Sequence, residues 1–199
     1  MNADEKTRAC ARVSVHRASD PASRYSIALA RPQDLASLPA IELAALTLFD
    51  GHGLDDVPTL VTSEADLRRA QERGHLWVAL TDDKPVGLAQ VNVIERNAVH
   101  LEELDVHPEH GRRGLGRKLV MAVCDWAAEQ GYEAVTLTTF RDIPWNMPFY
   151  ASLGFVVVPR EALTLALASV VHEESRRGLD PALRVVMRRV CDVRLSRAG

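Results

Sequence analysis

The sequence predicts one mixed α/β domain of the α+β kind, and three observations support this class. The chain has 199 residues, of which 47% are hydrophobic and 26% charged, values typical of globular domains. Three strand patterns follow one another between residues 75 and 106 with only short turns between them, as in an antiparallel meander. A glycine-rich loop, a helix pattern and a further strand pattern come next, which indicates a strand–loop–helix–strand unit.

Local signals define the elements before this meander. A strand is expected at Tyr25–Ala30, where apolar residues alternate with smaller or polar ones. A helix is expected from residue 32 to about 48, because proline suits the first helical turn and leucines recur at helical spacing. A short helix at Glu64–Arg73 is preceded by residues that can cap it and followed by a glycine.

The meander itself consists of strands expected at His75–Thr81, Pro85–Ile94 and Ala98–Val106. Polar turns at residues 82–84 and 95–97 separate these strands, and their shortness predicts antiparallel neighbours.

The second half alternates helix and strand patterns. An apolar stripe predicts a helix at Gly116–Gln130, and a run of β-branched residues predicts a strand at Ala134–Phe140. The expected elements beyond it are a short helix near Asn146–Leu153, a strand starting at Phe155, a helical connection at Pro159–Arg177 and a last strand at Leu183–Arg189.

Composition excludes several functional classes. The chain has 24 basic and 27 acidic residues, so no broad basic surface is available for nucleic acid or an anionic membrane. Its apolar stretches are shorter than the ~20 residues of a membrane span. The three cysteines lack metal-ligand spacing, which predicts no metal site and a reducing, cytoplasmic location. Residues 1–24 lack steady periodicity and are interpreted as a flexible extension of a domain spanning residues 25–190.

The loop at residues 111–116 has the features of a phosphate cradle. Its glycines permit close approach of the backbone, and the following helix directs free N–H groups at an anion. An ordinary glycine turn with solvated arginines is the alternative. The loop is not a nucleotide-binding P-loop, because Arg117-Lys118-Leu119 provides no hydroxyl group for magnesium. A dinucleotide fold is also excluded, since Leu119 stands where a small residue is needed.

Three segments in this order and spacing resemble the signature of GNAT-superfamily N-acetyltransferases. They are Leu104-Asp105-Val106-His107-Pro108, then Gly111-Arg112-Arg113-Gly114-Leu115-Gly116, and later Phe149-Tyr150-Ala151-Ser152-Leu153-Gly154-Phe155. The resemblance implies the GNAT fold, a mixed and mostly antiparallel sheet of six to seven strands flanked by helices.

The resemblance also implies acetyl-CoA as co-substrate. The backbone of Leu104, Asp105 and Val106 would then pair with the pantetheine arm. Pyrophosphate would be bound by the loop residues Arg112, Arg113, Gly114, Leu115, Gly116 and Arg117. Gly111 departs from the glutamine or arginine that the family has there, and the contact of Asn146 with the cofactor is left open because its spacing differs from the family's asparagine.

Two catalytic roles are expected from these positions. Tyr150 matches the family tyrosine that protonates the departing thiolate, and a phenol with an ordinary pKa of about 10 keeps its proton at neutral pH. A packing role for this ring is the alternative. The base that deprotonates the amine is expected to be Glu103, with Glu102 next and Asp105 also available. Adjacent strand residues point to opposite faces, so only one side of the strand is expected to face the acceptor.

The leading functional hypothesis is therefore transfer of an acetyl group to a primary amine by direct attack in a ternary complex, with a small amine slightly favoured. Three aspartates in residues 48–56 suggest a cationic amine, a solvated acidic loop being the alternative. A CoA- or acyl-CoA-binding module without turnover, and a protein or peptide N-acetyltransferase, are the competing hypotheses. The sequence is compatible with a homodimer but does not determine the oligomeric state.

Overall fold

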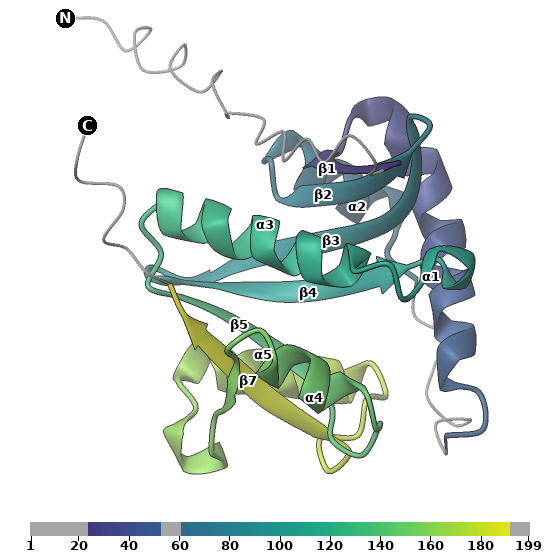
Figure 1. Ribbon diagram of the computed structural model, residues 1–199. Helices are drawn as coiled ribbons and strands as arrows, with labels where there is room; N and C mark the ends of the chain where they lie inside the picture. Colours follow the sequence, from purple (N-terminus) through teal and green to yellow (C-terminus); the bar gives the residue numbers. More distant parts are fainter. Residues whose placement is uncertain (1–23, 53–60, 192–199) are drawn as a thin grey trace, which may run out of the picture.

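A computed structural model describes residues 24–52 and 61–191 (Figure 1). Most of the predicted N-terminal extension lies outside the described residues, as do Asp55 and Asp56 of the acidic loop. Among the described residues, no helix combines the length and apolar character needed to cross a bilayer.

Within residues 24–52 and 61–191, seven strands form one sheet in the order β1-β2-β3-β4-β5-β7-β6. Their bounds are β1 Tyr25–Leu29, β2 Leu76–Thr81, β3 Lys84–Glu95, β4 Ala98–Val106, β5 Ala134–Phe140, β6 Val156–Val157 and β7 Arg184–Val190. All neighbouring pairs are antiparallel except β4 and β5, which run parallel. The predicted fold class is thus confirmed.

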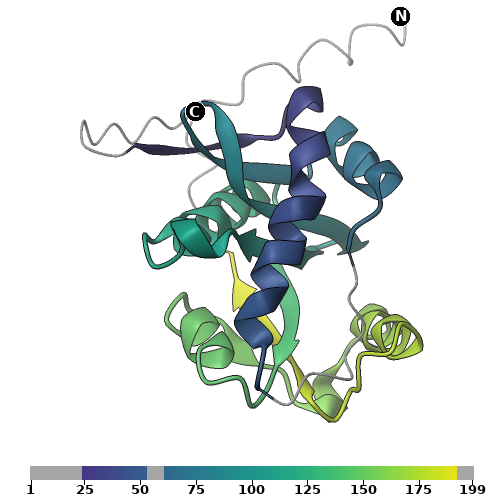
Figure 2. The same cartoon turned by 90° about the vertical axis from the view of Figure 1, so that its right-hand side faces the viewer.

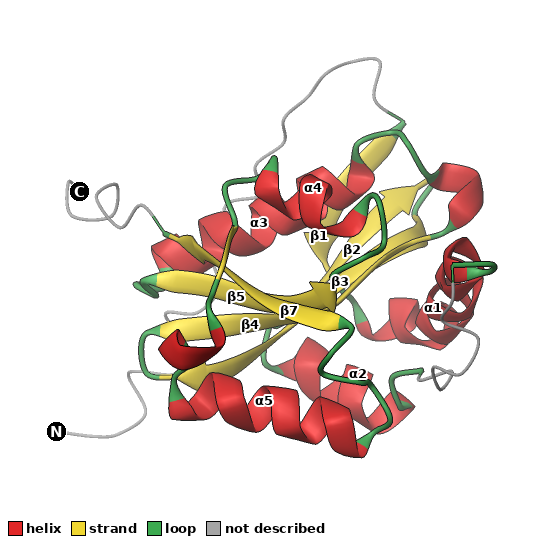
Figure 3. Cartoon of the chain, turned by 90° about the horizontal axis from the view of Figure 1, so that it is seen from below, coloured by secondary structure: helices red, strands yellow, loops and turns green. Residues whose placement is uncertain are grey.

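Helices cover both faces of this sheet (Figure 3). The α-helices are α1 Leu38–Leu46, α2 Glu64–Glu72, α3 Leu115–Glu129, α4 Asn146–Ala151 and α5 Leu165–Arg176. Helices α3 and α4 lie on one face, and α1, α2 and α5 lie on the other. Each face has its own apolar core, because alternate residues of β2 point to opposite sides: Trp77 and Ala79 pack with α3, whereas Leu76 and Val78 pack with α1 and α2.

The helix expected at residues 32–48 is divided into three parts. A 3₁₀ helix, η2 (Pro32–Ser37), precedes α1, and a second one, η3 (Thr47–Phe49), follows it. Pro39 accounts for the first division, because it has no N–H and its ring would clash with the carbonyl of Leu35 in a continuous α-helix. The helix therefore restarts with Pro39 in its first turn.

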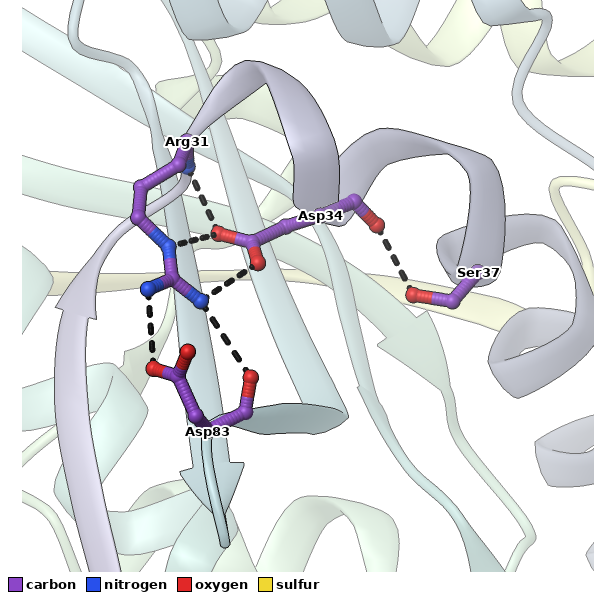
Figure 4. Close-up of polar contacts among 4 residues, drawn as sticks. All are labelled: Arg31, Asp34, Ser37 and Asp83. Atoms are coloured by element: carbon purple, nitrogen blue, oxygen red, sulfur yellow. Dashed lines mark hydrogen bonds and ion pairs between the residues drawn. The ribbon is translucent and has the colours of Figure 1, made fainter.

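An arginine anchors this segment to the sheet (Figure 4). Arg31 donates to the buried Asp34 carboxylate over 2.9 and 3.1 Å, and its guanidinium also donates to Asp83 over 2.8 Å. Asp83 lies in the turn between β2 and β3, so the contacts join the start of η2 to that turn. The chain continues from η2 into α1, which lies across the face formed by β3 and β4 (Figure 2).

Candidate active site

The parallel pair β4–β5 separates halfway along its length. The two strands are paired from Ala98–Ala134 to Leu101–Leu137, after which β4 continues to Val106 without a partner on this side within the described residues. Meanwhile β5 stays paired with β7 up to Phe140. The edge of β4 at Leu104–Val106 therefore offers backbone hydrogen-bonding groups to an extended ligand.

A β-bulge in β4 decides which side chains of this strand line the neighbouring cavity. Gln90 pairs with Glu103 and Val91 pairs with Leu101, so Glu102 is the extra residue of β4. Glu102 and Glu103 consequently line the same cavity. This corrects the expectation that adjacent strand residues point to opposite faces, because that rule holds only where the ladder is regular.

Glu103 is a half-buried acid of β4 whose pKa differs strongly from its ordinary value. Burial raises its pKa well above the ordinary value, and the negative charges of Asp105, Glu42 and Glu102 raise it further, whereas Arg184 opposes them. Its carboxyl group has no ion pair or hydrogen bond with any residue that the structure describes. A carboxylate with a raised pKa is a stronger base, which suits the expected role.

Unlike Glu103, Glu102 has both an ion pair and a hydrogen bond with other side chains. It lies 3.7 Å from the guanidinium of Arg177 and accepts a hydrogen bond from the Asn92 amide. Burial raises its pKa, and these two partners oppose the rise. Of the two expected bases, Glu103 is thus the one with free lone pairs.

Glu42 is a site residue that the sequence reasoning missed. It is buried in α1, and one carboxylate oxygen accepts from the backbone N–H of Thr62 over 2.6 Å while the other has no partner among the described residues. Burial and the charge of Glu42 together raise the pKa of Asp105 to about 7. The available signal was a single acid within the otherwise apolar helix Leu38–Leu46.

Tyr150 lies in α4 beside these acids. Its ring packs edge-on against Phe149 and Phe155, with centroid distances of 5.0 and 5.9 Å. Burial raises the pKa of its hydroxyl group, and the charges of Asp105 and Glu103 raise it further. The phenol therefore stays protonated at neutral pH, so the packing and proton-donor roles are compatible.

A buried ion pair near this site also escaped the sequence reasoning. Arg184 of β7 donates to both carboxylate oxygens of Glu174 of α5, over 3.1 and 3.2 Å. Arg184 also donates to the Thr138 hydroxyl over 2.8 Å. These bonds fix α5 to the strands β5 and β7, and they supply the positive charge that opposes the pKa rise of Glu103.

The glycine loop has the geometry expected of an anion site. Gly114 precedes α3 with a φ of +76°, a conformation that favours glycine, and no side chain that the structure describes caps the helix. The first intrahelical bond runs from Lys118 N–H to the Gly114 carbonyl over 3.0 Å, which leaves the amides of Leu115, Gly116 and Arg117 free of intrahelical partners. These orphan donors and the helix dipole fit a pyrophosphate.

The arginines of the loop differ in what they contact. Arg113 lies over the ring of Tyr25, 5.7 Å from its centroid. Arg117 donates to the carbonyl of Ser152 over 3.3 Å, and Arg112 is exposed with a φ of +55°. Arg112 is thus the arginine of the loop with its guanidinium least engaged by the described residues.

The start of α4 approaches the end of η3. Asn146 is the half-buried first residue of α4, and no described side chain is bonded to its amide group. Its neighbour Trp145 packs against Phe49 and His52, with ring centroids 6.3 and 4.8 Å apart. Among the described residues, no group of three or more histidines, cysteines or acids could hold a metal ion.

Comparison with known proteins identifies the family to which the chain belongs. The acetyltransferase (GNAT) family matches residues 44–155, and the chain belongs to this family. Solved structures share the fold: an Ard1 from Thermoplasma volcanium has a TM-score of 0.63 at 17% identity, over 84% of this chain and 98% of that one. The PaiA N-acetyltransferase from Thermoplasma acidophilum, in complex with coenzyme A, also has a TM-score of 0.63, at 15% identity over 83% of this chain and 98% of that one.

Among curated relatives, human N-acetyltransferase 8 is 33% identical over 105 residues, which are 49% of this chain and 46% of that protein. Rat N-acetyltransferase 8F1 is 28% identical over 113 residues, 53% of this chain and 51% of that protein. The chain spans about half the length of the curated relatives it matches.

Proposed function

We propose that the protein is an acetyl-CoA-dependent N-acetyltransferase that acetylates a primary amine by direct attack in a ternary complex. The observation that carries this proposal is the meeting of a free, high-pKa carboxyl group, Glu103, with a protonated phenol, Tyr150, where β4 leaves β5. One group can accept a proton and the other can donate one. The cytoplasmic location stays a prediction from the sequence, which is also compatible with a homodimer.

The described residues fit acetyl-CoA, which would supply an acetyl group activated as a thioester. The free edge of β4 at Leu104–Val106 suits the amides of the pantetheine arm. The orphan amides of Leu115, Gly116 and Arg117 suit the pyrophosphate, with the Arg112 guanidinium close in sequence. The coenzyme A bound to the PaiA neighbour supports this assignment.

Two proton transfers follow from the side chains. The Glu103 carboxylate takes the proton from the attacking nitrogen as the new C–N bond forms, and the Tyr150 hydroxyl group gives its proton to the sulfur as the C–S bond breaks. Burial and the charges of Asp105 and Glu42 raise the pKa of Glu103, which makes its carboxylate a stronger base. The products are an N-acetylated amine and free CoA.

A thiol-release assay with a panel of amines, combined with calorimetric titration of CoA, tests the proposal. Tyr150→Phe should lower kcat by about 100-fold or more while leaving CoA affinity unchanged, because only the proton donor is lost. Glu103→Gln should lower kcat/KM and remove the acidic limb of its pH profile. The matched controls are Tyr132→Phe, a half-buried ring beside Trp126, and Glu64→Gln, exposed on α2.

Two results would contradict the proposal. CoA binding without any acceptor-dependent release of CoA would favour a binding module without turnover. Unchanged turnover in both site variants would show that the proton transfers are assigned to the wrong residues.

A further inference from the structure

A cavity of about 440 Å³ is lined by residues of α2 and α5 among others, and these helices cover one face of the sheet (Figure 3). Glu103 is one of its lining residues, so the cavity adjoins the expected base. Its walls come from α2 and the residues around it, from β3 and β4, and from the end of α5. A cavity of this size admits a small molecule or a short peptide end.

Most charged residues that line the cavity have partners of opposite charge. The pairs are Asp66 with Arg69, Glu102 with Arg177 at 3.7 Å, and Glu173 with Arg176 at 3.3 Å. Two lining residues, Glu103 and Arg73, have no ion pair within residues 24–52 and 61–191. The cavity therefore presents one unmatched carboxyl group and one unmatched guanidinium, from different elements.

Gln90 is a second indication of a ligand. Its side chain lines the cavity at 5% exposure, and its amide oxygen has no hydrogen-bond partner among the described residues. It stands opposite Glu103 in the register of β3 and β4. A buried acceptor without a partner is costly, so this oxygen calls for a donor such as an ammonium or amide N–H group.

We infer that this cavity binds the acceptor and that the acceptor is an amine that also carries a carboxylate, such as an amino acid or a short peptide. The amino group lies against Glu103 and the Gln90 amide oxygen, and the carboxylate binds the guanidinium of Arg73. The inference rests on the proposed acetyl transfer. A plain cationic amine would use Glu103 but would leave Arg73 without a counter-charge, whereas an amino carboxylate matches both groups.

Three matched pairs of compounds test this selectivity: L-phenylalanine, β-alanine and glycylglycine, each against its carboxamide. Affinity is measured by calorimetry on the full chain saturated with CoA, and turnover by thiol release from acetyl-CoA. In at least one pair, the carboxylate form should bind about tenfold or more tightly than the amide, as expected for a charge-assisted hydrogen bond.

Variants in and directly after α2 separate the role of the Arg73 guanidinium from general charge effects. Arg73→Gln should abolish the preference for the carboxylate, and Arg73→Lys should restore part of it. Arg68→Gln is the matched control, because Arg68 is exposed on α2, as Arg73 is directly after it, but pairs with Glu64 and does not line the cavity. Equal or tighter binding of the amide in all three pairs, no binding of any compound, or an unaltered preference in Arg73→Gln would overturn the inference.

The two proposals fail in different ways. Binding of the carboxylate that depends on Arg73, without release of CoA, would disprove the activity and leave the assignment of the cavity intact. Turnover of amines at a rate that depends neither on their carboxylate nor on Arg73 would confirm the activity and overturn the inference.

Discussion

Asp105 offers a quantitative test of the electrostatics at the end of β4. Its pKa is raised from 3.8 to about 7 by burial and by the charge of Glu42. The folded protein therefore binds more protons at this group than the unfolded chain does. By linkage, its ionisation makes the free energy of unfolding fall as the pH rises from about 4 to about 7.

The size of the effect follows from these two values. Between pH 5 and pH 8, a group that titrates near 3.8 when unfolded and near 7 when folded removes about 2–3 kcal/mol of stability. In the Asp105→Asn variant this side chain cannot ionise, so the variant does not lose this part of its stability as the pH rises. The free energy of unfolding of the variant minus that of the parent protein should thus be about 2–3 kcal/mol larger at pH 8 than at pH 5.

Urea denaturation followed by circular dichroism, at both pH values, measures this difference. Contacts that the substitution breaks cost the same at both pH values, so they cancel. Asp125→Asn, exposed on α3, is the matched control and should show no such difference. If Asp105→Asn changed the free energy of unfolding equally at pH 5 and pH 8, Asp105 would not have the raised pKa on which the reasoning rests.

Three further predictions address the same parts of the fold. Glu42→Gln should move the acidic limb of the kcat/KM profile to lower pH by about 0.5–1 unit, because loss of the Glu42 charge lowers the pKa values of Glu103 and Asp105. A shift to higher pH would contradict this electrostatic effect of Glu42 on the two acids. Leu119→Ala should lower the free energy of unfolding in urea by about 3–5 kcal/mol, since Leu119 is fully buried against the sheet, and a loss below about 1 kcal/mol would contradict this packing. Gly114→Ala should cost about 1–2 kcal/mol and weaken CoA binding in calorimetry, whereas Gly131→Ala, at the other end of α3 and also at positive φ, should cost the same stability and leave CoA affinity unchanged.

Much of the fold follows from local sequence signals. The bounds of β4 and β5 match the expected ones because alternating or β-branched runs end there at turn residues. The division of the helix after residue 32 also had a local signal, Pro39, which was outweighed by the recurring leucines. The packing of Cys124 in the core follows from the apolar stripe of α3, and burial raises the pKa of its thiol to about 11.

The candidate site was only partly predictable. Tyr150, Glu103 and the glycine loop belong to contiguous motifs, so their types and spacing are visible in the chain. Glu42, Glu174 and Arg184 belong to no motif, and they reach the site only because α1, α5 and β7 pack around the ends of β4 and β5. Residue spacing carries no information on which remote charges meet.

The sequence by itself determined the order of the elements, the glycine loop expected to bind an anion and the side chains expected to move protons, because each depends on a few neighbouring residues. The tertiary structure decided which of these groups are free to act. The bulge at Glu102 exists only in the register with β3. Because of it, the side chains of two adjacent glutamates line the same cavity. Arg177 then engages Glu102, while the Glu103 carboxyl group, the Gln90 amide oxygen and the Arg73 guanidinium have no hydrogen-bond or ion-pair partner among the described residues. Pairing and burial of this kind depend on distances across the fold, which a linear pattern does not contain.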